Sequence, residues 1–353
     1  MTPTTAVEQD ELKKAWARLR DESPDLRIRE AAAQLNVSEA ELLATQTGET
    51  VTRLEPKFPE ILREFPALGR IMALTRNDQI VHERKGKFGA VEVFDGHGKM
   101  GLVLGDDIDL RIFFSKWRFA FAVTSDLPRG TQRSFQFFGA DGTAVHKVFL
   151  TAESDAAVYK NILEKYRAEN QNSPLEITPK PEKMPEKPDA EIDVAGFQKA
   201  WSELKDTHDF FPLLRKFGAA REQALRLADD AMAFRVPTAT YQDVLQKVCD
   251  AKLPIMIFVG NEGIIQIHTG EVEKIVEARG WFNVLDERFN LHIKQDEIAS
   301  AWIVKKPTAD GIVSSLEIFN AEGENIALLF GKRKPGISEQ KEWRELLATF
   351  KPI

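Results

Sequence analysis

The stretch LRIFFSKWRFAFAVTSDLPRGTQRSFQFFGADGTAVHKVF (110–149) has a second copy in the chain, LHIKQDEIASAWIVKKPTADGIVSSLEIFNAEGENIALLF (291–330). A constant offset of 181 residues aligns the two copies without a gap and gives ten identities among forty pairs. In both copies short apolar runs are separated by turn residues such as Ala140-Asp141-Gly142. This pattern predicts antiparallel strands joined by tight turns, built twice from one chain.

The repeat extends outward from these strands. Ala15-Trp16 pairs with Ala200-Trp201, with small insertions and deletions between the matched segments. Helical spacing comes before the strands in each half. We expect helices over 8–20, 28–46 and 56–65, and again over 195–205, 209–217, 220–232 and 240–250. Helices that precede strands, without strand–helix alternation, predict an α+β fold: a tandem structural repeat in which each half is a large antiparallel β-sheet with packed helices.

A proline-rich stretch, QNSPLEITPKPEKMPEKPDA (171–190), separates the two halves and holds five of the 17 prolines. With Lys and Glu and almost no apolar side chains, it favours extended conformations and reads as a semi-rigid linker. The expected organisation is therefore an N-terminal repeat over 1–170, a linker over 171–190 and a C-terminal repeat over 191–353.

Composition restricts the kind of protein. The net charge is −7, so wrapping of nucleic acid through bulk positive charge is not expected. The single cysteine, Cys249, excludes an intrachain disulfide framework and fits a reducing compartment. No apolar run approaches the roughly 18–20 residues of a membrane span. These features predict a cytoplasmic protein without membrane insertion.

A glycine-rich segment, Gly96-His97-Gly98-Lys99-Met100-Gly101, matches the GxGxxG fingerprint of dinucleotide-binding proteins. That fingerprint requires a preceding strand and a helix that begins at its end. The residues after it, Leu102 to Leu104, have the pattern of a strand. A glycine-rich hairpin is therefore the favoured interpretation.

One of the six histidines has a local sequence that suits a metal ligand. His208 lies in Asp206-Thr207-His208-Asp209-Phe210-Phe211-Pro212, before a short helix expected to end at Gly218. The positive end of a helix dipole disfavours imidazole protonation, and a metal binds the neutral imidazole. A metal ligand and an ordinary helix-start histidine both remain open. Since Ser23 aligns with His208 in the first half, any site that uses His208 should occur once per chain. The other histidines are expected to be surface or structural residues: His82, His97, His146, His268 and His292.

Four segments resemble the bacterial hemin-degrading factor family, cytoplasmic haem-utilisation and hemin transport proteins. They are DLRIFFSKWRFAFAV (109–123), SFQFFGADGTAVHKVFLT (134–151), LKDTHDFFPLLRKFG (204–218) and FGKRKPG (330–336). The resemblance covers nearly the whole chain. It implies two similar α+β halves and a b-type haem, as substrate or cargo, between the sheet and the helices of the second half.

The resemblance also implies roles for individual residues. His208 corresponds to the proximal ligand of the haem iron, and Arg111, in the D-L-R segment, to a catalytic arginine on the distal side. Cations that correspond to haem propionate partners are Arg221, Lys306 and Arg333. An arginine holds a carboxylate with two parallel hydrogen bonds, whereas lysine acts as a point charge.

The chain departs from the family just before Arg333. Many relatives carry tyrosine and glutamine there, whereas this sequence has Ala327, Leu328 and Phe330. Hydroxyl and amide contacts to the propionates are therefore not expected from these positions. Phe330, with Phe210 and Phe211, is a candidate for an apolar wall of the haem pocket, and simple core packing is an equal alternative.

Three classes of function follow. The first is a haem-degrading enzyme of the oxygenase type that releases iron, with an external electron donor or a partner reductase, because no flavin or nicotinamide site is evident. The second is a non-enzymatic haem carrier or buffer that delivers haem to a separate haem oxygenase, linked to a haem-uptake permease. A nucleic-acid-binding regulator has only the short basic run Lys332-Arg333-Lys334 in its favour and is not expected.

Overall fold

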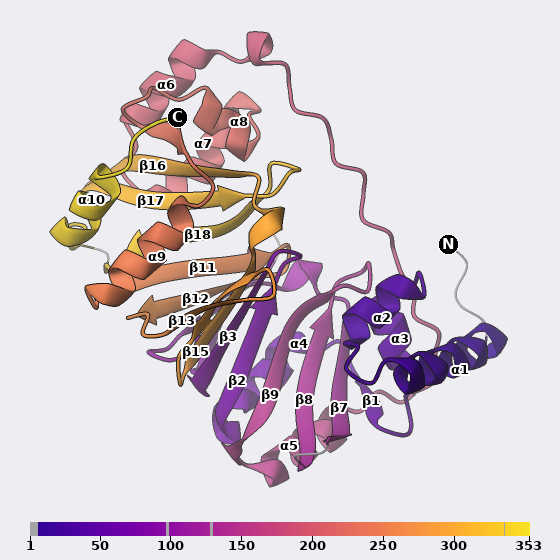
Figure 1. Ribbon diagram of the computed structural model, residues 1–353. Coiled ribbons are helices and arrows are strands. Elements are labelled where there is room, and N and C mark those ends of the chain that lie inside the picture. Colours follow the sequence, from indigo (N-terminus) through magenta and orange to yellow (C-terminus); the bar gives the residue numbers. More distant parts are fainter. Residues whose placement is uncertain (1–5, 97–98, 128–129, 335) are drawn as a thin grey trace. The chain divides into compact units, whose positions relative to one another are not determined.

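The computed structural model describes residues 6–96, 99–127, 130–334 and 336–353, so His97 and Gly98 lie outside the described residues. The chain forms helices and two nine-stranded antiparallel sheets, which confirms the expected α+β class (Figure 1). Val91–Phe94 and Met100–Leu104 form an antiparallel pair of strands. A strand, not a helix, therefore follows the glycine-rich segment, in agreement with the hairpin interpretation.

In the described residues of its first half, the sequence supplies nine strands and five α-helices. The strands are β1 (Val51–Leu54), β2 (Gly69–Arg76), β3 (Ile80–Lys87), β4 (Val91–Phe94), β5 (Met100–Leu104), β6 (Asp109–Phe113), β7 (Phe119–Leu127), β8 (Gly130–Phe138) and β9 (Ala144–Ser154). The α-helices among the described residues are α1 (Ala6–Glu22), α2 (Ile28–Gln34), α3 (Glu39–Ala44), α4 (Phe58–Glu64) and α5 (Ala156–Tyr166).

The second half repeats this pattern. Its strands are β10 (Ala233–Val236), β11 (Ile255–Asn261), β12 (Ile264–Gly270), β13 (Ile275–Ala278), β14 (Trp281–Leu285), β15 (Phe289–Lys294), β16 (Ser300–Thr308), β17 (Gly311–Phe319) and β18 (Asn325–Gly331). Its described helices are α6 (Val194–Ser202), the 3₁₀ turn η4 (Thr207–Asp209), α7 (Phe210–Phe217), α8 (Arg221–Arg226), α9 (Thr240–Asp250) and α10 (Lys341–Ala348).

The sheet topology confirms the repeat. One sheet has the order β1-β7-β8-β9-β2-β3-β15-β14-β13 and the other β10-β16-β17-β18-β11-β12-β6-β5-β4. Phe119 pairs with Phe138 in the first half, and Ser300 pairs with Phe319 in the second, at the same offset of 181 residues. Both halves also shift register at the same position, after Phe137 and after Ile318. The alignment of 110–149 with 291–330 therefore holds residue by residue in the strands.

Alternation along the strands gives each sheet two covered faces. In the second half, Ala301 and Ile303 of β16 pack with α9 and α10, whereas Trp302 and Val304 pack with α6, α7 and α8. The first half is built alike: Ala120 and Ala122 pack with α4 and α5, and the α3 side chains contact the opposite face of β7. The face that carries α6, α7 and α8 holds most of the predicted site residues.

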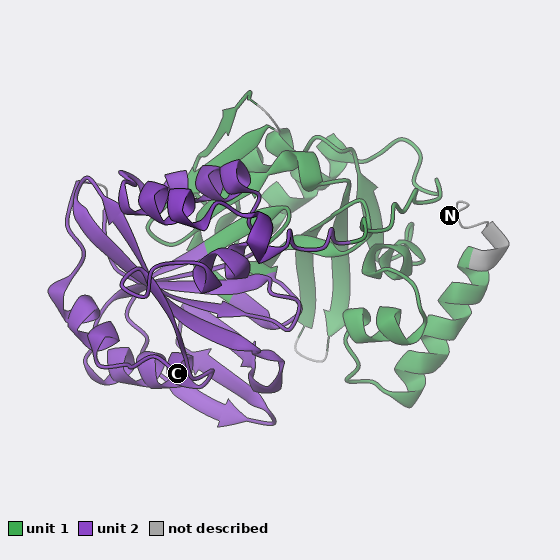
Figure 2. Cartoon of the chain, turned by 90° about the horizontal axis from the view of Figure 1, so that it is seen from above, with its two compact units in different colours: residues 1–75, 83–182, 261–266 green, residues 76–82, 183–260, 267–353 purple. Residues whose placement is uncertain are grey.

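The chain divides into two compact units, and each takes a short segment from the other half of the sequence (Figure 2). Unit 1 comprises 1–75, 83–182 and 261–266, and unit 2 comprises 76–82, 183–260 and 267–353. In unit 1, the indole of Trp117 donates to the carbonyl of Gly263 at 2.9 Å. In unit 2, the Asn77 amide donates to the carbonyl of Ile326 at 2.9 Å.

Two expected helices differ from the structure. The stretch 28–46 forms two helices, because Asn36 adopts a left-handed conformation (φ 54°) and Ser38 caps α3 by accepting the Glu41 amide. The helix expected over 220–232 ends at Arg226, and the amide of Met232 then donates to the carbonyl of Asp229 in a turn. Among the described helices, none has the length and apolar character needed to cross a membrane.

Candidate functional site

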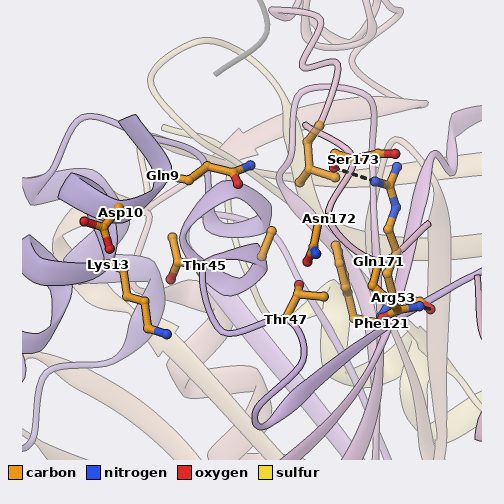
Figure 3. A pocket seen from close by; sticks show the side chains of 12 residues that line it. Gln9, Asp10, Lys13, Thr45, Thr47, Arg53, Phe121, Gln171, Asn172 and Ser173 are labelled. Carbon is orange, nitrogen blue, oxygen red and sulfur yellow. Dashed lines mark hydrogen bonds between the residues drawn. The ribbon is translucent and has the colours of Figure 1, made fainter. Parts of the chain in front are cut away.

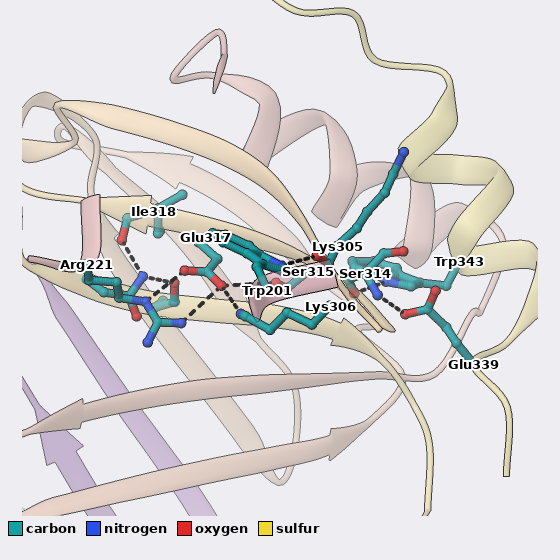
Figure 4. A network of polar contacts seen from close by, with 12 residues as sticks. Trp201, Arg221, Lys305, Lys306, Ser314, Ser315, Glu317, Ile318, Glu339 and Trp343 are labelled. Carbon is teal, nitrogen blue, oxygen red and sulfur yellow. Dashed lines mark hydrogen bonds and ion pairs between the residues drawn. The ribbon is translucent and has the colours of Figure 1, made fainter. Parts of the chain in front are cut away.

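A buried charge network in unit 2 joins two of the predicted cations through a glutamate (Figure 4). Arg221, the first residue of α8, donates from Nε and Nη2 to the two carboxylate oxygens of Glu317 on β17, at 2.8 and 3.0 Å. Lys306 Nζ on β16 donates to the same carboxylate at 2.7 Å. The Lys306 side chain is only 4% exposed and that of Glu317 is fully buried, whereas Arg221 keeps 26% exposure.

The network carries an excess of one positive charge, because two cations share one carboxylate. Burial would raise the pKa of Glu317, but the charges of Arg221 and Lys306 outweigh this effect and lower the pKa to about 2. Burial lowers the pKa of Lys306 against the attraction of Glu317. One further carboxylate placed beside Arg221 would therefore neutralise the cluster and stabilise the Lys306 ammonium.

An aromatic ring covers this network. Phe210 is a buried residue at the start of α7, and its ring centre lies 4.5 Å from Lys306 Nζ and 5.5 Å from Arg221 Cζ. The next residue, Phe211, is 60% exposed. The two phenylalanines therefore differ: Phe210 belongs to the core beside the cations, and Phe211 offers apolar surface to a ligand.

His208 lies in the 3₁₀ turn η4, directly before α7, and its side chain is 90% exposed. Asp206 caps the turn: its Oδ1 accepts the His208 backbone amide at 2.8 Å and lies 2.6 Å from His208 Nδ1. The hydrogen bond from the His208 backbone amide is the main cause that lowers the pKa of Asp206, and the positive charge of Arg333 lowers it further. The imidazole is thus held at one nitrogen and open to solvent on the rest of its ring.

Phe330 lies near the end of β18, and Arg333 follows two residues after this strand ends. Arg333 pairs with Asp310 at 3.9 Å, and its side chain is largely buried. Phe330 on β18 is partly buried and packs edge-to-face with Phe258, with ring centres 5.3 Å apart. Unit 2 therefore brings Arg221 and Lys306 together, and places Arg333 within electrostatic range of the Asp206 that holds His208.

Arg111 belongs to unit 1, where it lies on β6. Its guanidinium forms an ion pair with Asp109 on the same strand and also donates to the carbonyl of Leu110 at 3.2 Å. The side chain keeps 30% exposure. Burial raises the pKa of the Asp109 carboxyl even though Arg111 contacts it. The guanidinium is thus anchored on one side, with part of its surface accessible.

The sequence reasoning did not single out Glu317 or Asp206. Glu317 stands at a position of the apolar run Ser315-Leu316-Glu317-Ile318-Phe319 that faces inward, and a charge at such a position requires a buried partner. Asp206 stands two residues before His208, the spacing of a capping turn. Both signals were present in the sequence, but a partner for Glu317 on α8 is evident only from the fold.

A polar cavity of about 190 Å³ lies in unit 1 (Figure 3). Arg53, Phe121 and Gln171 line it, and Arg53 Nη1 donates to the carbonyl of Ser173 at 2.8 Å. Burial, then repulsion by Arg118, lowers the pKa of Arg53. None of the residues matched to haem contacts lines this cavity.

Comparison with known proteins gives the same two-part division. The family model for the haemin-degrading HemS/ChuX domain matches twice, over residues 36–166 and 218–350. The hemin transport protein HmuS of Yersinia pestis is 35% identical over 338 residues, 96% of each chain. The hemin transport protein HemS of Yersinia enterocolitica is 34% identical over 328 residues, 93% of each chain.

Solved structures with the same architecture span nearly the whole chain. The holo form of PhuS, a heme-binding protein from Pseudomonas aeruginosa, is 47% identical with a TM-score of 0.95, over 98% of this chain and 99% of PhuS. The heme-degrading enzyme ChuS of Escherichia coli O157:H7 is 33% identical with a TM-score of 0.90, over 98% of this chain and 100% of ChuS.

Proposed function

Because this chain belongs to the HemS/ChuX haemin-degrading family, we propose that it binds one haem, with His208 as the proximal ligand of the iron. The observation that carries the proposal is the pairing of an exposed imidazole with a buried cluster of excess positive charge in the same unit. Haem is a flat apolar disc with two carboxylates, and it requires both a ligand for iron and cations at one edge. Phe211, three residues after His208, supplies exposed apolar surface.

The propionates are the proposed partners of Arg221, Lys306 and Arg333. A propionate beside Arg221 neutralises the excess charge that Glu317 leaves. Arg333 is already paired with Asp310, so it offers part of its guanidinium. Phe330 contributes ring surface without a hydroxyl, and its contact with the haem is therefore apolar. This charge pattern favours a dicarboxylate ligand over an uncharged macrocycle.

Arg111 is the proposed distal-side catalytic residue, in line with the family resemblance. Haem supplies the iron and the macrocycle that reacts with oxygen when an external donor provides electrons. The part of Arg111 is to donate hydrogen bonds on the distal side, while Asp109 keeps its guanidinium in place. We therefore favour a haem-degrading function that releases iron in the cytoplasm, supported by a partner reductase.

A carrier function is the second candidate, and one observation favours it. The His208 side chain is 90% exposed on a three-residue turn, so the ligand lies on an accessible element from which haem can exchange. Relatives are named both as transport proteins and as a heme-degrading enzyme. A carrier would receive haem from an uptake permease and deliver it to a separate haem oxygenase.

Haem titration of the wild type, His208→Ala and Ser23→Ala tests the binding proposal. The wild type and Ser23→Ala should saturate at one haem per chain with the same Soret band. His208→Ala should lose at least tenfold in affinity or change its ligation spectrum. Because His208 is exposed, its replacement should change the free energy of unfolding by less than about 0.5 kcal/mol. Equal affinity and spectra in all three proteins would contradict the assignment.

A single-turnover reaction with reductant, oxygen and catalase separates the two functions. Catalase removes free peroxide, which degrades bound haem nonspecifically. Loss of the porphyrin band in the wild type, slowed at least tenfold in Arg111→Ala with little change in haem affinity, would support the enzyme. A stable porphyrin band, together with transfer to an oxygenase that is faster than transfer to a haem scavenger, would support the carrier.

A further inference from the structure

We infer that Asp206 is a positioning residue for the haem ligand: it holds the Nδ1–H of His208 and so directs the Nε2 lone pair to the iron. The inference rests on the proposed function, because it assigns a role at the same site. The proposed ligand, His208, and the proposed cationic partners of the propionates do not by themselves assign any role to Asp206.

The geometry of the capping turn carries the assignment. Asp206 has an extended backbone (φ −143°, ψ 142°), which lets its side chain reach forward over the turn. Its Oδ1 accepts from the His208 amide at 2.8 Å and lies 2.6 Å from His208 Nδ1. An ionised carboxylate has no proton to donate, so the proton of this second bond belongs to Nδ1. In the neutral imidazole, Nε2 is then the nitrogen with the free lone pair.

The exposure of His208 makes this contact more important than it would be in a packed core. A side chain with 90% exposure has few neighbours that could restrict its rotamer or select a tautomer. One carboxylate oxygen that bonds both the backbone and the ring restricts both. A carboxylate behind a metal-bound histidine also makes the imidazole a stronger electron donor, and its loss typically lowers metal affinity about 10–100-fold.

A second acidic residue on the same turn provides a matched control. Asp209 follows His208 directly, but within the described residues no hydrogen bond or ion pair joins its side chain to the imidazole. Asp209→Asn removes the same charge from the same turn as Asp206→Asn. Any effect of general negative charge near the haem should therefore appear in both variants, whereas an effect of the specific contact should appear only at Asp206.

The test compares Asp206→Ala, Asp206→Asn and Asp209→Asn with the wild type, each loaded with haem. Asp206→Ala should weaken ferric haem binding by about 10–100-fold. In the ferrous state, its iron–histidine stretching frequency should fall and its midpoint potential should rise, because the imidazole donates less charge. Asp206→Asn keeps an acceptor oxygen and should be intermediate, and Asp209→Asn should match the wild type. Equal shifts at 206 and 209, or none at either, would overturn the inference.

A measurement without haem separates failure of this inference from failure of the proposed function. In the ligand-free protein, nitrogen NMR of the histidines should show His208 as the Nδ1–H tautomer, and Asp206→Ala should shift it toward the Nε2–H form usual in solution. A wild type that already shows the Nε2–H form overturns the inference, whatever the haem result. A wild type that binds haem without need of His208 overturns the proposed function instead.

Discussion

The two repeats share one scaffold but differ in the charge at the same place. In the strands, the register matches Glu317 with Gln136 and Lys306 with Ser125. In the helices, Arg221, the first residue of α8, matches Glu39, the first residue of α3. The second repeat thus holds two cations and one anion there. In the first, Glu39 pairs with Lys147 of β9, and the charges cancel. The two copies thus keep the same fold, and a few polar differences give the second copy an excess of one positive charge.

The largest expected effect is a loss of stability when Glu317 is replaced. The first repeat has an uncharged residue, Gln136, at this strand position. Glu317→Gln introduces the counterpart of Gln136. It leaves the buried Lys306 and the partly exposed Arg221 without their carboxylate. We expect the free energy of unfolding to fall by about 3–5 kcal/mol, the usual cost of breaking a buried ion pair. Urea unfolding measures it. The exposed pair Lys341–Glu345 serves as the control, since Glu345→Gln should change stability by less than about 0.5 kcal/mol. Similar values for the two variants would contradict the network.

The next largest effect is a pH dependence of the stability, caused by a buried histidine that the second repeat lacks at the matching position. His146 of β9 is buried and bonded to Thr75, and Ala327 stands at its counterpart. Burial is the main cause that lowers the pKa of His146 from 6.5 to about 3. Below pH 6.5 His146 is protonated in the unfolded chain, whereas in the folded chain it stays neutral until about pH 3. The free energy of unfolding therefore decreases as the pH falls from 6.5 to about 3.

The loss should amount to about 1.4 kcal/mol per pH unit, or about 2 kcal/mol between pH 6.5 and 5. His146→Leu should remove this part of the pH dependence, whatever it does to stability at neutral pH. Urea unfolding of both proteins at pH 7.5, 6.5 and 5 measures the difference. Parallel curves for wild type and variant would show that His146 does not titrate as a buried group.

The smallest effect concerns the ligand. Lys306→Ser introduces the counterpart of Ser125 and leaves Arg221 and Glu317 with no excess charge. We expect a loss of about tenfold in haem affinity, or about 1.4 kcal/mol, and a much smaller loss for haem with esterified propionates. Absorbance titration measures both ligands, and circular dichroism confirms folding. The adjacent Lys305, which contacts Phe234 rather than Glu317, gives the control variant Lys305→Ser. Equal losses for both haems would exclude a propionate contact.

Much of the fold followed from local patterns in the sequence. The helix expected over 240–250 matches α9, and Gly218 ends α7 in the left-handed conformation (φ 67°) that glycine adopts easily. The break at Asn36 between α2 and α3 has a weaker signal in the sequence, because asparagine occurs inside helices as well as at their ends. The strand β10, only four residues long, gave too short a pattern to separate from the loop around it.

The site was less accessible to sequence reasoning than the fold. The resemblance pointed to His208, Arg221 and Lys306, but no spacing rule connects the start of α8 with two strands about 90 residues further on. Glu317 could be marked as a misplaced charge in an apolar strand, yet its two partners depend on tertiary packing. The excess charge of the cluster, which carries the proposed function, is therefore a property of the folded unit and not of any segment.

The exchanged segments limit how this chain can be divided. Residues 261–266 complete unit 1 and residues 76–82 complete unit 2, although each segment is encoded in the opposite half. Separating the chain at the proline-rich connection would therefore leave the Trp117 indole and the Asn77 amide of the N-terminal fragment without their acceptors. The C-terminal fragment would retain those acceptors, the carbonyls of Gly263 and Ile326, without their donors. Both halves of the sequence therefore have to be present for either unit to be complete.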